Sequence, residues 1–262
     1  MVDIANSRWV VTGAAGTVGS ALRVALHERQ VELVSTDVRS TAPVGPNDRV
    51  LTADLADLRA LEQVLDGADG VIHLGGLADE ADFHDLAAVN IVGTYHVLEA
   101  ARRSGVPRVV YASSNRVTGM YTADTVVSPD MPARPDGFYG VSKVAGEALC
   151  RLYSDKFGIS TAAVRIGSYE PRPGTAREQR TWLSPDDALR AFLAAMTTDQ
   201  TAVFYAVSAN SSRWWDLAAG AAIGYLPEDD AATWLAESPI DPTQPQGGPY
   251  ATAEYSLDRM RE

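Results

Sequence analysis

The chain has 262 residues, 46% of them hydrophobic, so it is long enough to bury a sizeable core. A formal net charge of −12 argues against nucleic acid as a partner, because binding a phosphate chain needs a basic face. No apolar run reaches the roughly 18 residues of a membrane span, and no signal-peptide pattern precedes the first strand. One cysteine, Cys150, allows neither an internal disulfide nor a cysteine-rich metal site. We therefore expect a cytoplasmic protein with no membrane partner and no metal.

Strand-like and helix-like segments alternate along the first two thirds of the chain. Strands are predicted at residues 8–12, 32–37, around 50, 70–74, 108–112 and 161–166. Helices are predicted at residues 17–29, 58–65, 85–104 and 139–157. Parallel neighbours need crossover connections of this length, so the pattern predicts a parallel sheet with helices on both faces. The expected fold class is α/β, a doubly wound sheet of the Rossmann type.

After residue 167 the pattern loosens. Proline and glycine at 171–174 predict a loop, Pro185 starts a helix, and residues 203–207 form a late strand before a Pro- and Gly-rich tail at 239–249. Because few residues follow the sixth strand, any second lobe must be small. We expect a single domain over residues 1–262, in which about 168–262 contributes a small substrate-binding lobe.

A glycine triplet lies between the first strand and the first helix, in the string TGAAGTVG. Glycines there let the backbone turn tightly and approach a pyrophosphate, whose charge is met by the free N–H groups and the positive end of the helix dipole. The triplet alone is weak evidence, but it has the strand, the helix and the later acid that the motif requires. The predicted cradle consists of Gly13, Ala15, Gly16, Thr17, Val18 and Gly19.

The acid is Asp37, which closes the second strand. A carboxylate there accepts hydrogen bonds from the adenine ribose hydroxyls and repels a 2′-phosphate, so the predicted cofactor is NAD rather than NADP. Arg39 lies close by and keeps a phosphate open as the alternative. Asp54 and Leu55 follow the third strand, where the adenine edge would lie, although they also read as an ordinary helix start.

Tyr139 and Lys143 are spaced i and i+4 at the start of a helix, so both side chains lie on one face. A phenol acts as a base near neutral pH only if nearby positive charge stabilises its phenolate. Lys143 and an oxidised nicotinamide would supply that charge. Ser114, at the end of the fifth strand, would hold the substrate oxygen whose proton the tyrosine takes. A Tyr/Lys pair with no such context would read as a solvated helix face.

The glycine turn, the fifth-strand serine and the YxxxK pair together resemble the extended short-chain dehydrogenase/reductase superfamily. Within it, several longer strings are similar to those of NAD-dependent uronate dehydrogenases. They are DLAD from Asp54, HLGG from His73, ASSN from Ala112, PARPDG from Pro132, VRIGS from Val164, TW from Thr181 and WWD from Trp214. The resemblance implies oxidation of glucuronic or galacturonic acid at the anomeric carbon, giving an aldaric acid lactone.

The resemblance also implies roles for residues at matching positions. It places Leu74, Gly75, Gly76 and Asn90 beside the cofactor, with Asn90 near the active site. It implies sugar contacts from Ser114, Asn115, Ser168 and Arg177, with Arg177 gripping the carboxylate. The chain departs from the family pattern at two positions, where it has Arg116 and Ala78.

Arg116 is expected to contact the substrate, as a second guanidinium beside an anionic sugar. Because arginine suits carboxylate, sulfonate and phosphate alike, the departures leave the sugar's identity open, and sulfoquinovose is an alternative. The competing interpretation of Arg116 and Arg177 is ion pairing with some of the many acids. Arg165, His73 and the two tryptophans at 214–215 are interpreted as structural.

Two other functions stay open. An NAD-dependent sugar epimerase or dehydratase would share the cradle and the Tyr/Lys pair but usually has a larger C-terminal lobe. A non-catalytic dinucleotide sensor would have no need of Ser, Tyr and Lys together. The long helices at 85–104 and 139–157 resemble those that pair subunits in related folds, so a homo-oligomer is expected by analogy.

Overall fold

Seven parallel strands form the central sheet, in the order β3-β2-β1-β4-β5-β6-β9, and the computed structural model describes residues 4–261 of the chain. The strands are β1 (Arg8–Thr12), β2 (Glu32–Asp37), β3 (Asp48–Thr52), β4 (Gly70–His73), β5 (Arg108–Ser114), β6 (Ser160–Ile166) and β9 (Ala202–Ala206). The order reverses between β1 and β4, and ligands of such sheets bind at the carboxyl ends of the strands beside this switch point. The predicted doubly wound fold is confirmed.

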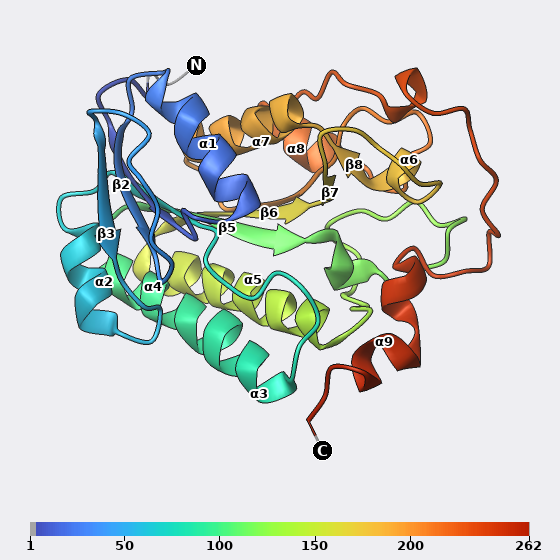
Figure 1. Cartoon of the computed structure of the whole chain (residues 1–262), viewed down its shortest axis with the longest axis horizontal. Helices are drawn as coiled ribbons and strands as arrows, with labels where there is room; N and C mark the ends of the chain where they lie inside the picture. The colour runs from blue at the N-terminus through green and yellow to red at the C-terminus, as the bar shows by residue number, and fades with distance from the viewer. Residues whose placement is uncertain (1–3, 262) are drawn as a thin grey trace.

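Helices cover both faces of the sheet (Figure 1). On one face lie α1 (Thr17–His27), α7 (Pro185–Thr197) and α8 (Ala218–Ala222). On the other lie α2 (Leu58–Leu65), α4 (Gly93–Arg103) and α5 (Phe138–Phe157). The smaller elements are α3 (Phe83–Leu86), β7 (Ser168–Tyr169), α6 (Glu178–Thr181), β8 (Trp182–Leu183), α9 (Ala253–Leu257) and the 3₁₀ turns Asn115–Thr118, Ala231–Thr233 and Gly248–Ala251.

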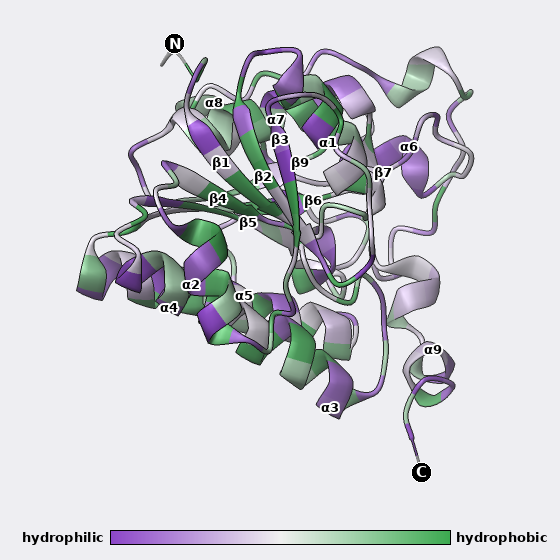
Figure 2. Cartoon of the chain, turned by 60° about the vertical axis from the view of Figure 1, so that its left-hand side comes forward, coloured by the Kyte–Doolittle hydropathy of each residue, from purple (hydrophilic) through white to green (hydrophobic). Residues whose placement is uncertain are grey.

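The core lies on both faces of the sheet, because the central strands β1, β4 and β5 are buried on both sides. Val11 packs in the cluster under α1 and α7, and its neighbour Val10 packs in the cluster under α2, α4 and α5. Consecutive strand residues point to opposite faces, so a strand covered twice must be apolar along its whole length. Figure 2 shows this as hydrophobic colour concentrated in the strands.

Some predicted boundaries differ from the structure. The single helix predicted at 85–104 is broken into α3, a π-helical turn at Ala87–Val92, and α4. Such one-turn widenings leave no clear periodic signal in a sequence and are frequent at functional sites. The first helix ends at His27 rather than at residue 29, just before Gln30 adopts the left-handed conformation with φ 61°.

The chain from residue 168 onward contributes strands to two separate sheets. β9 pairs in parallel with β6 and extends the main sheet, whereas β7 and β8 form a separate two-stranded sheet. Trp214 and Trp215 pack with Tyr205 in a small third cluster, as the structural interpretation of the tryptophans predicted. The last segment runs back across the molecule, and α9 lies near α3 and the start of α5 (Figure 1).

Candidate functional site

The glycine turn joins the end of β1 to the start of α1. Gly13 has φ 68°, and a Cβ there would lie 2.6 Å from the carbonyl carbon of Leu74 and from the amide nitrogen of Gly75. A Cβ on Gly19 would lie 2.3 Å from the carbonyl oxygen of Gly13. Only glycine therefore permits this close contact of the turn, the helix and the loop after β4. Gly16, the N-cap of α1, has no side chain to satisfy the first N–H groups, which suits an anionic ligand such as a pyrophosphate.

Asp37 stands at the edge of this turn, at the end of β2. Its Oδ2 accepts the backbone N–H of Ala15 at 3.0 Å, and its Oδ1 accepts that of Arg39 at 2.9 Å. The Arg39 side chain is 65% exposed, and its Nε lies 3.5 Å from the same carboxylate. The carboxylate is therefore fixed beside the turn where the ribose of a dinucleotide is expected, while the arginine extends into solvent.

The loop after β4 closes the opposite side of the turn. The Gly75 N–H donates to Thr12 Oγ1, and Leu55 packs against Gly75, where a Cβ would lie 3.2 Å from its Cδ1. Asp54 is exposed and accepts the backbone N–H of Ala56. The structure thus brings Leu74, Gly75 and Leu55 to the glycine turn, and their contacts with a cofactor stay a prediction.

Asn90 lies in the π-helical turn and binds this loop to α5. Its Oδ1 accepts the Leu77 N–H at 2.8 Å, and its Nδ2 donates to the Leu77 carbonyl and to Ser142 Oγ, both at 3.0 Å. Ser142 Oγ in turn donates to the carbonyl of Tyr139. Asn90 therefore holds the backbone beside Gly76, and a direct contact between its side chain and a cofactor stays a prediction.

His73 is buried behind the glycine turn. Its Nδ1 lies 2.7 Å from Thr12 Oγ1 and its Nε2 lies 3.1 Å from Thr94 Oγ1. Burial, and to a smaller extent the charge of Lys143, lowers the pKa of His73 to about 3. The imidazole is therefore neutral at ordinary pH and links β1, β4 and α4.

We predict that this residue makes the protein less stable in mild acid. The folded pKa lies below the ordinary value of 6.5, so below that pH the unfolded chain binds a proton that the folded chain does not. The free energy of unfolding should fall by about 1.4 kcal/mol per pH unit from this group as pH drops below roughly 6.5. Urea unfolding at pH 7 and pH 5 measures this, and His73→Gln should show a shallower dependence. An unchanged pH dependence in the variant would contradict the assignment.

Ser114, Tyr139 and Lys143 meet where β5 ends beside the start of α5. Ser114 hydrogen-bonds to the Tyr139 phenol. Lys143 Nζ donates to the carbonyl of Ala112 at 2.9 Å and lies 5.6 Å from the centre of the Tyr139 ring. Burial raises the pKa of Tyr139 to about 12, against the hydrogen bond from Ser114 and the charge of Arg116, which lower it. Burial lowers the pKa of Lys143 to about 8. These groups alone leave the phenol protonated at neutral pH.

Asn115, Ser168 and Arg177 line the continuation of this site beyond β5 and β6. The amide nitrogen of Asn115 is buried and has no hydrogen-bond partner in the part of the chain that the structure describes. Arg177 Nε donates to the Gln246 carbonyl at 2.9 Å, and Nη1 donates to Ser168 Oγ at 3.3 Å. Within residues 4–261 no carboxylate pairs with this guanidinium, and burial lowers its pKa. An anion at this place would meet a guanidinium that interacts with Asp136 and Glu178 only at longer range.

Arg116, unlike Arg177, is surrounded by carboxylates. Its three nitrogens donate to Asp136 at 2.8 Å, Asp79 at 2.9 Å and Glu80 at 3.2 Å. Burial acts to lower the pKa of Arg116, but Asp136 and the other carboxylates outweigh it and raise the pKa. Three of its five N–H donors are thus engaged by protein carboxylates, as the ion-pair interpretation predicted. Its guanidinium carbon lies 5.1 Å from the centre of the Tyr139 ring, and its predicted sugar contact stays a prediction.

Neither the acidic residues around Arg116 nor the C-terminal segment that covers them was predicted from the sequence. Tyr255 donates to Asp79 at 2.6 Å, and Ser256 donates to Glu80 at 2.9 Å. The guanidinium carbons of Arg116 and Arg177 lie 4.6 and 5.1 Å from the centre of the Tyr250 ring. A short helix signal existed, since Thr252 caps α9, but nothing local indicated where that helix docks.

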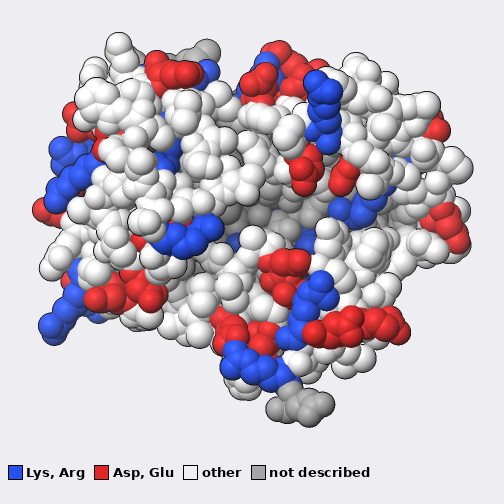
Figure 3. Space-filling view, in the orientation of Figure 1, with Lys and Arg blue, Asp and Glu red and all other residues white. Residues whose placement is uncertain are grey.

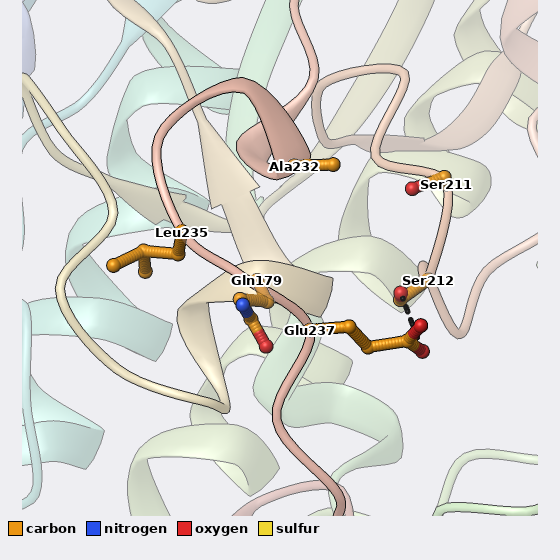
Figure 4. Close-up of a pocket in the computed structure, with 6 residues that line it drawn as sticks. All are labelled: Gln179, Ser211, Ser212, Ala232, Leu235 and Glu237. Atoms are coloured by element: carbon orange, nitrogen blue, oxygen red, sulfur yellow. Dashed lines mark hydrogen bonds between the residues drawn. The ribbon is translucent and has the colours of Figure 1, made fainter.

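The face seen in Figure 3 is hollowed near its centre, with basic side chains inside and acidic ones around the opening. Two other hollows carry no predicted site residue. One, of about 460 Å³, is open and lies along α2 between Arg59, Glu62, Gln63 and Asp66. The other, of about 60 Å³, is too small for a sugar and is lined by Gln179, Ser211, Ser212, Ala232, Leu235 and Glu237 (Figure 4).

The described residues form neither a metal-binding cluster nor a membrane-spanning helix. Across positions 4–261, His, Cys, Asp and Glu side chains form no group of three or more that is placed to bind a metal ion. Over the same positions, the helices lack the length and apolar character of a bilayer span.

Comparisons with known proteins identify the family of the chain. A family model described as the NAD dependent epimerase/dehydratase family matches residues 9–170. Uronate dehydrogenase of Pseudomonas putida is 38% identical over 94% of this chain and 96% of its own length. The structure of a glucuronic acid dehydrogenase from Chromohalobacter salexigens is 39% identical with a TM-score of 0.90, covering 96% of this chain and 99% of that one.

A mutant uronate dehydrogenase from Agrobacterium tumefaciens, solved in complex with NAD, is 40% identical with a TM-score of 0.88, covering 94% of this chain and 97% of that one. The predicted resemblance is confirmed over nearly the whole length. The chain belongs to the NAD dependent epimerase/dehydratase family and is similar to the uronate dehydrogenases within it.

Proposed function

We propose that this protein oxidises a hexuronic acid, glucuronate or galacturonate, at C1 to the aldaric acid lactone with NAD as cofactor. The observation that carries the proposal is that one site holds both a buried phenol, hydrogen-bonded to Ser114, and Arg177, which pairs with no carboxylate in the described part of the chain. The first supports proton removal from a hydroxyl, and the second supports an anionic group on the same molecule. The named relatives are uronate or glucuronic acid dehydrogenases.

The cofactor cradle supports NAD. Its glycine turn excludes side chains from the path of the pyrophosphate, and the fixed Asp37 carboxylate favours ribose hydroxyls over a 2′-phosphate. Bound NAD supplies the hydride acceptor and a positively charged ring that favours the phenolate. If NAD is the cofactor, exposed Arg39 has no 2′-phosphate to bind.

The protein residues then act on the sugar. Ser114 hydrogen-bonds to the C1 hydroxyl and orients it towards Tyr139, which takes the proton. Lys143 contributes positive charge near the ring of Tyr139, and its buried contact with the Ala112 carbonyl holds it there. Arg177 and Ser168 bind the substrate carboxylate, and the unpaired amide of Asn115 is available for a ring hydroxyl. Orientation of this kind is worth several kcal/mol of barrier.

The test is an NADH-absorbance screen of the purified protein with NAD or NADP. Glucuronate and galacturonate should produce NADH, while glucose and galactose, which lack the carboxylate, should react at least about 30-fold less efficiently. Sulfoquinovose tests the sulfonate alternative, because a guanidinium also binds sulfonate. An epimerase would convert a sugar without net NADH, and a dinucleotide sensor would bind NAD without turnover on any sugar. Either result would refute the proposal.

The homo-oligomer and the cytoplasmic location stay predictions. Val92, Tyr95, Val141 and Leu152, from the π-helical turn, α4 and α5, are exposed apolar side chains, as a subunit interface on these helices would require. The molecular mass in solution would test the assembly.

A further inference from the structure

The first turn of α5, which carries Tyr139, has no capping side chain of its own. Its N-cap is Gly137, in an extended conformation. A Cβ at Gly137 would lie 2.4 Å from Oε2 of Glu80, so the serine, threonine or aspartate that usually caps a helix has no room here. The first N–H groups of the helix must find their acceptors elsewhere.

Glu80, from the loop between β4 and α3, supplies those acceptors. Its Oε1 accepts the Phe138 N–H at 2.8 Å, and its Oε2 accepts the Tyr139 N–H at 3.1 Å. One carboxylate thus satisfies two N–H groups that α5 cannot satisfy itself, one of them on the residue proposed as the base. Its negative charge also lies at the positive end of the helix dipole.

The Glu80 carboxylate is held from its other side as well. Its side chain is 0% exposed, Arg116 donates to Oε2 at 3.2 Å, and Ser256 donates to Oε1 at 2.9 Å. A buried carboxylate is costly unless its oxygens are hydrogen-bonded, and here both oxygens have two donors each. The four donors come from α5, the turn after β5, and the C-terminal segment, so their shared acceptor is fixed in three directions.

We propose that Glu80 is a positioning residue for Tyr139, acting as the cap of α5 in place of Gly137. It holds the first turn of the helix so that the phenol stays beside Ser114. The inference rests on the proposed function, in which Tyr139 is the base. A displacement of about 1 Å at a reacting group costs on the order of 100-fold in rate.

Two substitutions test this. Glu80→Ala removes both acceptors, and we expect kcat for NADH formation to fall about 100-fold while the Kd for NAD changes by less than about 3-fold. Glu80→Gln keeps one acceptor oxygen but sets an NH₂ group against a donor N–H. It should fold if the alanine variant does not, and should lose roughly 10-fold in kcat.

Asp57→Ala is the matched control, because Asp57 also accepts two backbone N–H groups, both at 3.0 Å, at the start of α2. It should lower stability and leave kcat at saturating NAD unchanged. A second measurement needs no turnover: amide exchange at Phe138 and Tyr139 should accelerate at least about 10-fold in the Glu80 variants and not in Asp57→Ala.

The outcomes separate the two proposals. If the unmodified protein forms no NADH from any uronate, the proposed function fails, and amide exchange still decides whether Glu80 holds α5. Wild-type kcat in both Glu80 variants would overturn the inference. So would unchanged exchange at the start of α5, or an equal loss of kcat in Asp57→Ala.

Discussion

Replacing Tyr139 by Phe is expected to lower kcat for uronate oxidation by about 10²- to 10⁴-fold, the range that a positioned acid–base group contributes. The substitution removes only the phenol oxygen that Ser114 contacts and keeps the buried ring. The Km for NAD should change little, because the glycine turn and Asp37 are untouched. Steady-state kinetics at saturating NAD and uronate measure the effect.

Tyr153→Phe is the control for this variant. Tyr153 is a second buried tyrosine on α5, and its hydroxyl donates to Glu99 at 3.0 Å, on the face towards α4. Its loss should cost on the order of 1 kcal/mol of stability without lowering kcat. A Tyr139→Phe protein that kept more than about a tenth of wild-type kcat would rule out the phenol as the base, since proton transfer contributes at least about 100-fold.

The fold was predictable because the signals for it are local and repeated. Apolar strands, intervening helices and a glycine turn each leave a pattern in neighbouring residues, and the sheet order follows from the crossover rule. The neighbourhood of Ser114, Tyr139 and Lys143 was predictable for the same reason. Two of them share one helix face, and the third ends the adjoining strand.

The surroundings of Arg116 were not predictable in this way. Its three carboxylates come from the loop after β4 and from the loop before α5. Two of the three tyrosines beside it, Tyr250 and Tyr255, come from the last fifteen residues. Contacts between such distant segments depend on how loops pack, and irregular loops have no periodic signal. An arginine in sequence therefore reads the same whether its charge is free or neutralised. Sequence alone therefore does not show that Arg116 pairs with three carboxylates while Arg177 binds Gln246 and Ser168.

Because Arg177 lacks, among the described residues, the carboxylate partners that Arg116 has, its replacement should strongly reduce uronate oxidation. Arg177→Ala should lower kcat/KM for glucuronate and galacturonate by roughly 30- to 150-fold, which is the loss of about 2–3 kcal/mol from hydrogen bonds to a charged group. Its Nε and Nη1 are held by Gln246 and Ser168, while Nη2 has no partner in the described part of the chain. The side chain is thus oriented in advance with a donor left free. The loss should appear mainly in KM, because the carboxylate is bound equally in ground and transition states.

Arg172→Ala provides the charge-matched control. Arg172 lies in the same loop, is exposed, and stacks over Trp234 at 4.5 Å, so its removal takes away one positive charge without touching Ser168. If long-range attraction by net charge drew the uronate in, both variants would lose similar efficiency, and the loss would disappear at high salt. If Arg177 binds the carboxylate directly, only Arg177→Ala loses it, and the residual rate on glucose stays the same. Unchanged uronate kinetics in Arg177→Ala would show that the substrate carboxylate binds elsewhere than at Arg177. Arg116 is a poor second candidate, because it already pairs with three protein carboxylates.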